Sequence, residues 1–325
     1  MSTKGRDFRG VIRPVGAVVL GIGVMIALCA GVGMIWDRFA PDPSRPQGGA
    51  AALALSAIIV SALGAFAFFY GKRFVSERLS RREAILAVSL IWIAAGICGA
   101  FPFVLGAGMS PVDSFFESVS GLTTTGATVV TDIEGRLSRP LLLWRSLIQW
   151  LGGMGIVVLF VAVFPNLGAG GKHLFRGEVP GTTAEGLRPR IAETSFALWK
   201  LYALLTLVEI ALLKVLGLDL FDAVCHAFTT MSTGGFSTLD GSVGGFNRPA
   251  VEYVIACFML IGSVNYGLYY ALLRTGNWRG VFRNIEFRWY LLIVAISVVV
   301  LTVLNLSVHD EILTSFRYSF FMVAT

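Results

Sequence analysis

The sequence predicts an all-α polytopic membrane protein built from repeated units. Each unit consists of a spanning helix, a short re-entrant helix, a glycine-containing loop and a second spanning helix. The composition is 55% hydrophobic and 14% charged, with a mean hydropathy of +0.75, which lies outside the range of soluble globular domains. Apolar runs long enough to cross about 30 Å of hydrocarbon recur along the chain. A loop of small hydroxyl residues ending in glycine also occurs twice, as TTTG at residues 123–126 and STGG at residues 232–235.

Residues 1–70 are expected to form two transmembrane helices that lie outside the repeat. The first apolar run, at about residues 11–36, follows a basic amino terminus. It is much longer than the apolar region of a secretory signal, so it indicates a helix that stays in the membrane. The second run, residues 50–70, follows a turn at Pro41-Asp42-Pro43.

Residues 71–165 are expected to form the first repeat unit. A basic loop precedes a predicted span at residues 83–106, and residues 111–122 form an apolar segment that is too short to cross the membrane. Its helical spacing and the start at Ser110-Pro111 predict a half-crossing helix. The loop at 123–126 follows, and the return span is predicted from residue 140 to about residue 165.

Residues 166–274 are expected to form the second unit, which begins with a basic, glycine-rich cytoplasmic linker. Its predicted spans are residues 194–216 and 249–273, and its short helix is predicted at residues 219–231. Residues 275–325 form an incomplete third unit, with a predicted span at 289–306 and a third short helix starting near Glu311.

Two aspartates align the repeated loops. Asp222 follows Asp113 by 109 residues, and Gly235 follows Gly126 by the same interval. The same loop at the same place in two successive units indicates an internal repeat. We expect both aspartates to cap their short helices, and their charge near the outer mouth would also concentrate cations.

The distribution of positive charge predicts the orientation. The amino terminus and the three basic loops hold 17 of the 26 lysines and arginines, whereas the opposite loops hold six. Cytoplasmic loops carry the excess of positive charge in membrane proteins. The amino terminus is therefore expected in the cytoplasm, and both glycine loops are expected to enter from the outside.

Non-helical backbone at membrane depth needs a physical justification. Each unsatisfied peptide group costs several kcal/mol unless it lines an aqueous path or is buried in protein. Carbonyls around an axis can replace the hydration shell of a monovalent cation, and short helices can point their negative carboxyl ends at it. A single loop of this kind would more often be an extracellular turn, but its duplication favours a selectivity filter. The candidate ion-binding residues are Thr123, Thr124, Thr125, Gly126, Ser232, Thr233, Gly234 and Gly235.

Three charged residues within predicted helices need partners. Glu117 and Arg145 both lie near the outer side, so we expect a structural ion pair, the alternative being that Arg145 extends alone to the outer interface. Glu209 lies in the middle of a span. It is interpreted either as a carboxyl satisfied by a neighbouring helix or by Lys214, or as a proton or cation relay.

Histidines and cysteines give no indication of a metal site, a cofactor site or a disulfide framework. They are scattered at irregular spacing, with the cysteines in apolar surroundings. The residues are His173, His226, His309, Cys29, Cys98, Cys225 and Cys257.

Four motifs resemble a known family. They are FESVSGLTTTGAT at residues 116–128, LWR at 143–145 with QWLGGMG at 149–155, MSTGGFST at 231–238, and IGSVNYGL at 261–268. These motifs resemble the Trk-type members of the Trk/Ktr/HKT superfamily of potassium transporters, and the resemblance covers essentially the whole chain. The two additional amino-terminal helices are also typical of the Trk branch.

The resemblance implies a K+-channel-like pore of four such units around one axis in the cytoplasmic (inner) membrane, with K+ as the transported ion. It also implies a homodimer that is regulated by a peripheral nucleotide-binding cytoplasmic subunit. Membrane lipid is expected as a further partner, and nucleic acid is not. Glycine at Gly126 and Gly235 favours K+, because members that prefer Na+ commonly carry serine in the first filter. Channel-like transport and symport both stay open.

The third unit stops inside its short helix. If Phe320-Phe321 corresponds to Phe115-Phe116, the third filter glycine would fall about six residues beyond Thr325. We therefore expect a fragment of a longer transporter that supplies two of four filter segments and does not conduct alone.

Two other function classes were considered. A secondary solute transporter with discontinuous helices also uses interrupted spans, although there the break lies within a spanning helix. A membrane-embedded enzyme would need a nucleophile with its base or a metal cluster at membrane depth, and the sequence offers neither. The chain is therefore not expected to be an enzyme.

Overall fold

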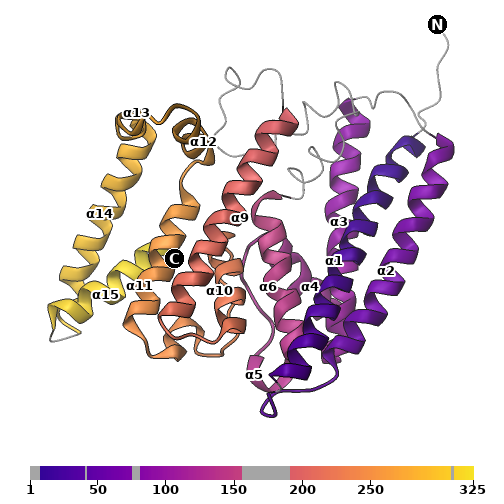
Figure 1. Cartoon of the computed structure of the whole chain (residues 1–325), viewed down its shortest axis with the longest axis horizontal. Coiled ribbons are helices and arrows are strands. Elements are labelled where there is room, and N and C mark those ends of the chain that lie inside the picture. Colours follow the sequence, from indigo (N-terminus) through magenta and orange to yellow (C-terminus); the bar gives the residue numbers. More distant parts are fainter. Residues whose placement is uncertain (1–7, 41, 75–80, 156–190, 309–310) are drawn as a thin grey trace, which may run out of the picture.

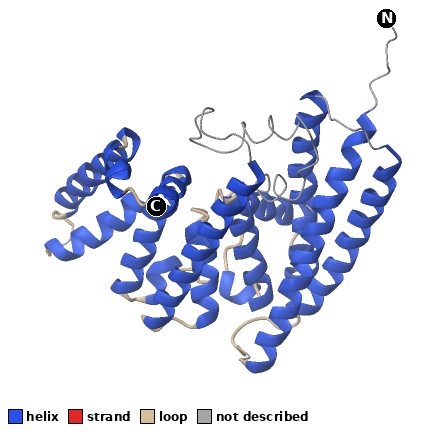
Figure 2. Cartoon of the chain, turned by 45° about the horizontal axis from the view of Figure 1, so that its top comes forward, coloured by secondary structure: helices blue, strands red, loops and turns tan. Residues whose placement is uncertain are grey.

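The computed structural model describes residues 8–40, 42–74, 81–155, 191–308 and 311–325. These residues form helices joined by loops and contain no strand (Figure 2), so the all-α prediction is confirmed for them. Five of the described helices are long and apolar enough to cross a membrane, or six if one bent pair counts as a single span. The last part of the predicted return span and the basic linker, residues 156–190, lie outside the described residues.

The amino-terminal helices form a tightly packed antiparallel pair. After a short 3₁₀ turn, η1 (Phe8–Val11), α1 (Ile12–Phe39) crosses in one direction and α2 (Gly49–Gly71) returns to end in η2 (Lys72–Phe74) (Figure 1). Gly16, Gly23, Gly64 and Gly71 lie where a side chain would run into the backbone of the other helix. Small residues allow helices in a membrane to approach closely, and packing replaces the hydrophobic driving force that acts in water.

The first unit begins with α3 (Arg81–Ala107). The short helix α4 (Pro111–Leu122) follows, with the predicted bounds. Ser110 caps it by accepting the N–H of Asp113 at 3.1 Å, and Pro111 occupies a first-turn position that needs no N–H donor. A four-residue helix, α5 (Ile133–Arg136), leads to α6 (Arg139–Gly153).

The second unit repeats this order. It consists of α9 (Ile191–Val215), the short helix α10 (Leu220–Met231), a 3₁₀ turn η3 (Ser242–Phe246) and α11 (Pro249–Ser263), followed by α12 (Tyr266–Thr275). The prediction of one continuous return span over residues 249–273 is wrong. Between α11 and α12 the chain bends by 84°.

Local chemistry explains the break between α11 and α12. Val264 adopts an extended conformation with ψ of 142°, and the side chain of Asn265 accepts the N–H of Gly267 at 2.9 Å to start a new helix. Asparagine competes for backbone donors in this way and is favoured at helix starts. The continuous hydropathy of residues 249–273 hides this local capping signal at Asn265.

The third unit contains α14 (Ile285–Asn305) and a third short helix, α15 (Ile312–Ala324), close to its predicted start. Helix α15 packs on α11, where Arg317 lies 3.4 Å from Glu252 and the ring of Phe320 lies 6.1 Å from that of Tyr253. The predicted basic loop before α14 is largely helical, because it contains α12 and α13 (Trp278–Arg283).

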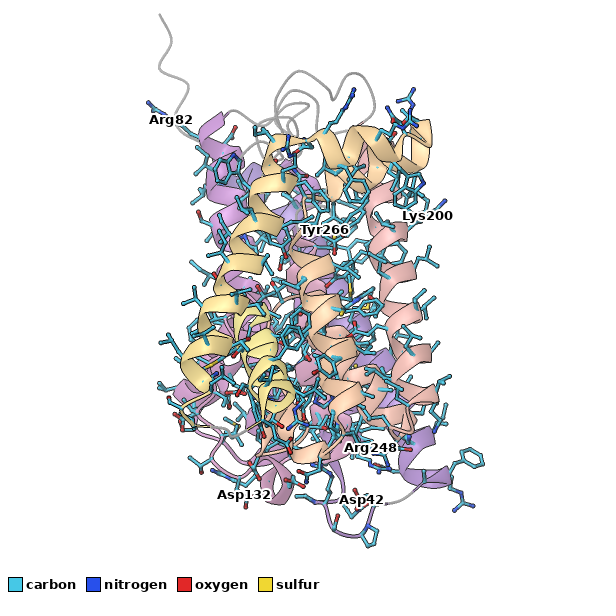
Figure 3. The ribbon with its side chains drawn as sticks, turned by 90° about the vertical axis from the view of Figure 1, so that its left-hand side faces the viewer. Asp42, Arg82, Asp132, Lys200, Arg248 and Tyr266 are labelled. Carbon is cyan, nitrogen blue, oxygen red and sulfur yellow. The ribbon has the colours of Figure 1, made fainter. Side chains whose placement is uncertain are left out.

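Charged residues mark the two ends of the molecule. Arg82 and Lys200 lie toward one end, whereas Asp42, Asp132 and Arg248 lie toward the other (Figure 3). Helices α4 and α10 occupy the half of the molecule that contains α5 (Figure 1). Each is 12 residues long, or about 18 Å, so neither crosses about 30 Å of hydrocarbon. This arrangement agrees with two short helices that enter and leave on the same side.

The close contact between α1 and α2 gives a test of the fold. Gly64→Leu is expected to lower the stability by about 1–3 kcal/mol, since the added side chain would meet the backbone of Leu20. Gly21→Leu is the matched control, because nothing lies within 4 Å of a side chain built there. Thermal unfolding of both variants in detergent measures the difference, and equal melting temperatures would contradict the packing.

Candidate functional site

The two glycine loops share an unusual backbone conformation. Thr124 and Thr233 have φ of 56° and 53°, and Gly126 and Gly235 have φ of 75° and 78°. Glycine adopts this left-handed region readily. A threonine does not, because its branched Cβ crowds the backbone at a cost of roughly 1–2 kcal/mol. The same strained position at the same place in both loops indicates that the surrounding structure imposes it.

The hydrogen bonds of the two loops also repeat. In each, the left-handed threonine donates its N–H to the carbonyl three residues earlier, and the next residue donates to the carbonyl five residues earlier. The bonds are Thr124 to Gly121 at 3.0 Å and Thr125 to Ser120 at 2.9 Å in the first loop, and Thr233 to Thr230 at 2.8 Å and Gly234 to Thr229 at 2.9 Å in the second. This Schellman arrangement ends a helix.

The carbonyl groups of the loops are left available. None of the hydrogen bonds among the described residues uses a carbonyl oxygen of residues 123–126 or 232–235. The N–H groups that end each short helix are satisfied internally, so the oxygen atoms are the free polar groups. Unpaired carbonyl oxygens at the negative end of a helix suit a cation that has lost its water.

Helix α6 lies directly behind both loops. Arg145, Gln149, Gly152 and Gly153 recur at intervals of four, three and one residues, which brings them to one face of the helix. Gln149 is fully buried, and its Oε1 accepts the N–H of Phe236, just beyond the second loop, at 3.2 Å. The motif at residues 149–155 is therefore a packing surface for the loops.

The two glycines of α6 allow this close approach. A side chain at Gly152 would run into the carbonyl of Leu122, at the end of the first short helix. A side chain at Gly153 would run into Ser232, the first residue of the second loop. One helix thus contacts the end of the first short helix through Gly152 and the second loop through Gly153.

The loops also meet each other. A Cβ atom at Gly126 would overlap the carbonyl group of Gly234. Backbone cannot move aside as the end of a flexible side chain can, so Gly126 is required both by its dihedral angle and by its neighbour. Gly235 is required by its dihedral angle alone, because nothing lies within 4 Å of a side chain built there.

Glu117 and Arg145 form a buried ion pair. Arg145 Nε lies 2.7 Å from Glu117 Oε1, with side-chain exposures of 2% and 0%. The hydroxyl of Thr128 donates to the same carboxylate at 2.9 Å, and the N–H of Val129 donates at 3.2 Å. The short helix is therefore bonded both to α6 and to the extended segment that leaves the first loop.

Arg145 continues into the second unit. It donates from an Nη atom to the carbonyl of Ser237 at 2.9 Å, and its guanidinium carbon lies 3.6 Å from the centre of the Phe236 ring. A cation over an aromatic face in a desolvated place is a favourable contact. One arginine thus connects the first short helix to the segment that leaves the second loop.

The second unit has its own version of the carboxylate contact, which our sequence interpretation missed. His226 follows Glu117 by 109 residues and Ser237 follows Thr128 by the same interval. His226 Nε2 lies 3.1 Å from Ser237 Oγ. In both units a buried side chain of the short helix forms a hydrogen bond with a hydroxyl of the segment that leaves the loop. Applying the repeat interval to Glu117 would have identified His226, which we had grouped with the scattered histidines.

Asp113 and Asp222 do not cap their helices as expected. The caps are Ser110 and Asp219, and the two predicted residues lie in the first turn. Asp113 accepts a hydrogen bond from the Ser110 hydroxyl at 2.8 Å, and Asp222 accepts one from Thr238 at 2.7 Å. Their charge still favours the positive end of each helix.

Glu209 is fully buried on α9. Its carboxyl group faces Thr230 of α10, but neither oxygen makes a hydrogen bond of normal geometry. The interpretation that Lys214 satisfies it is wrong, because Lys214 is exposed and the described ion pairs do not include this one. The relay interpretation stays a prediction.

Comparison with known proteins identifies the family. The chain matches the family described as TrkH: Cation transport protein over residues 52–323. The chain belongs to the TrkH family of cation transport proteins. The family resemblance that the four motifs indicated is thereby confirmed.

Several TrkH-family relatives are similar along most of the chain. The Trk system potassium uptake protein TrkH of Salmonella typhimurium is 38% identical over 323 residues, which cover 98% of this chain and 65% of the relative. The Trk system potassium uptake protein TrkG of Escherichia coli is 37% identical over 274 residues, covering 82% and 56%. The chain thus spans less than two thirds of the length of these relatives.

A solved structure supports the fold as well. The crystal structure of the potassium transporter TrkH from Vibrio parahaemolyticus matches with a TM-score of 0.82 at 32% identity, over 98% of this chain and 64% of that one. The predicted fold class, with its K+-channel-like pore units, is confirmed by this match. Within the part of the chain that the structure describes, no three histidine, cysteine, aspartate or glutamate residues gather as a metal site would require.

A double-mutant cycle tests the buried pair. Glu117→Gln and Arg145→Gln are each expected to lower the stability by about 3–5 kcal/mol, because each leaves the other charge buried without its partner. The loss of stability in the double variant should be clearly smaller than the sum of the two single losses, as measured by thermal unfolding in detergent.

The partly exposed pair Arg317–Glu252, with side-chain exposures of 21% and 13%, is the control cycle. Its coupling should lie near the value for exposed pairs, about 0.2–1 kcal/mol. Coupling of equal size in both cycles would contradict a special role for Glu117 and Arg145.

Proposed function

We propose that this chain supplies two segments of a selectivity filter through which K+ is taken up across the cytoplasmic membrane. The observation that carries the proposal is the repetition of one loop geometry at an interval of 109 residues, with left-handed Thr124 and Thr233 and unpaired carbonyls in both loops. The ion-binding residues would be Thr123, Thr124, Thr125, Gly126, Ser232, Thr233, Gly234 and Gly235.

The physical mechanism follows from the loops and the helices before them. Carbonyl oxygens replace water around the ion and so offset the cost of dehydration. The carboxyl ends of α4 and α10 add a negative potential equivalent to about half an elementary charge each. Glu117, Arg145 and Gln149 take no direct part in binding the ion. They hold the loops in a geometry that the loops would not keep alone.

Two observations support K+ as the ion. The relatives of the chain are named as potassium uptake proteins, and both loops have glycine at the last position. Serine at Gly126 would displace the Gly234 carbonyl, which changes the cage that the ion meets. The break between α11 and α12 lies within a predicted span, as the rival solute-transporter interpretation requires. That interpretation does not account for the loop geometry that repeats after α4 and α10.

The remaining predictions complete the proposal. Residues 71–165, 166–274 and 275–325 would be successive pore units, with residues 1–70 outside them. The amino terminus would lie in the cytoplasm, where a peripheral nucleotide-binding subunit would regulate a homodimer. Transport would be the activity, without enzymatic chemistry, either as a channel or by symport.

Uptake of Rb+ by bacterial cells that lack their own K+ uptake systems tests the function. The intact gene product should support uptake that excess Na+ does not inhibit. Gly126→Ser is expected to lower Rb+ uptake at least tenfold or to admit Na+, because the change disturbs both the dihedral angle and the neighbouring carbonyl. Gly235→Ser should have a smaller effect, since only the dihedral angle opposes it.

Gly244→Ser is the control, because this glycine lies in the outer turn η3 with nothing within 4 Å of a built side chain. It should leave uptake unchanged at equal membrane expression. If Gly126→Ser and Gly244→Ser transport Rb+ equally well, with the same Na+ insensitivity, the loops are not the filter.

A further inference from the structure

The corner segment, residues 266–289, turns between α11 and α14 and combines two features that the proposed filter does not use. Four arginines lie exposed in it, against a single acid, Glu286. Large apolar side chains are exposed beside them. These side chains are Leu273 (69% exposed), Trp278 (64%), Phe282 (59%), Ile285 (69%) and Trp289 (58%).

Hydrogen bonds hold the corner segment and the start of α14 against α11. The hydroxyl of Tyr269 on α12 donates to the carbonyl of Ile261 at 2.9 Å, and that of Tyr290 on α14 donates to Leu260 at 2.9 Å. Both tyrosines therefore bind to the last turns of α11, from two different helices. These two hydrogen bonds fix the position of the segment against α11.

Helix caps within the corner segment add to its rigidity. Asn277 accepts the N–H of Gly280 and Asn284 accepts that of Phe287, each at 3.0 Å. Gly276 ends α12 with φ of 63°, and the rings of Phe282 and Phe287 lie 5.8 Å apart in an edge contact. The connections α12 to α13 and α13 to α14 therefore each have their own local stabilisation.

The depth of the segment follows from α14. This helix has 21 residues, about 31 Å, which matches the thickness of the hydrocarbon layer. Its first turn, at Ile285 to Trp289, therefore lies at the boundary between hydrocarbon and headgroups. Helix α13 comes directly before it, and α12 is turned by 84° from α11. Figure 1 shows both lying across the end of the molecule where α14 begins.

Arginine mixed with tryptophan at this depth is typical of contact with lipid headgroups. Arg274, Arg279, Arg283 and Arg288 make none of the described ion pairs. A guanidinium group binds a phosphate through two parallel hydrogen bonds, while the apolar side chains can enter the acyl boundary. A soluble acidic partner would satisfy the arginines but would leave the apolar side chains at the hydrocarbon boundary without a matching surface.

We propose that the corner segment is a binding surface for anionic phospholipid, with its arginines on the lipid phosphates and Trp278 and Phe282 in the acyl boundary. The bound lipid would stabilise the turn between the second and third units. The proposal does not depend on which ion the loops select.

Native mass spectrometry of the purified protein in detergent tests the proposal, with phosphatidylglycerol and phosphatidylcholine as probes. Arg279→Gln/Arg283→Gln is expected to weaken retention of phosphatidylglycerol by about fivefold for each arginine removed, and to leave phosphatidylcholine unchanged. Arg38→Gln/Arg136→Gln is the matched control, because both arginines are exposed at the opposite end of the molecule. It should retain phosphatidylglycerol as the parent protein does.

Two further measurements distinguish a loss of charge from a loss of folding and test whether Trp278 contacts lipid. Arg279→Lys/Arg283→Lys preserves the charge and should retain most of the phosphatidylglycerol, which separates charge from folding. In vesicles, brominated phosphatidylglycerol should quench a fluorescence component that Trp278→Phe removes. Three outcomes would each overturn the proposal. They are an equal loss of phosphatidylglycerol in the control double variant, no preference for phosphatidylglycerol over phosphatidylcholine, and no quenching of Trp278. The last outcome would indicate that protein covers the surface.

Discussion

The buried contact between α6 and the two glycine loops is the interaction on which the rest of the site depends. Arg145 and Gln149 lie one turn apart and bind groups of both units: the carboxylate of Glu117, the carbonyl of Ser237 and the N–H of Phe236. A charged guanidinium group in the interior is costly unless all its neighbours are in place. That sensitivity makes the contact specific, because a displaced loop would leave a buried charge without a partner.

The loops need this support because they are strained. Threonine in a left-handed conformation at Thr124 and Thr233 is less favourable than glycine by roughly 1–2 kcal/mol. Glycine at those positions would relieve the strain but would remove a hydroxyl and would loosen the backbone. The structure instead retains the side chain and holds the conformation from behind with α6, and from the side through Glu117–Thr128 and His226–Ser237.

Much of the fold could be predicted from the sequence, because spanning length and repeated loops are strong signals. The bounds of α4 and the start of α15 followed from helical spacing and from Ser110-Pro111. The bend after Ser263 was missed because hydropathy continues through it, whereas the extended conformation of Val264 and the cap at Asn265 are local features. At the site, Glu117 and Arg145 could be paired because few charges lie within the helices. The contacts of Gln149 could not be predicted, since they join residues 87 positions apart.

Two contacts between the repeated units constrain how their sequences can diverge. Gly126 lies against the Gly234 carbonyl, and the N–H of Ile133 donates to Asp240 at 2.7 Å. Each copy of the duplicated segment completes itself with atoms of the other, so the unit of sequence repetition is not a unit of folding. A substitution accepted in one copy must be compatible with a backbone that the other copy supplies. Divergence after duplication is therefore constrained jointly, and neither half can be exchanged as an independent module.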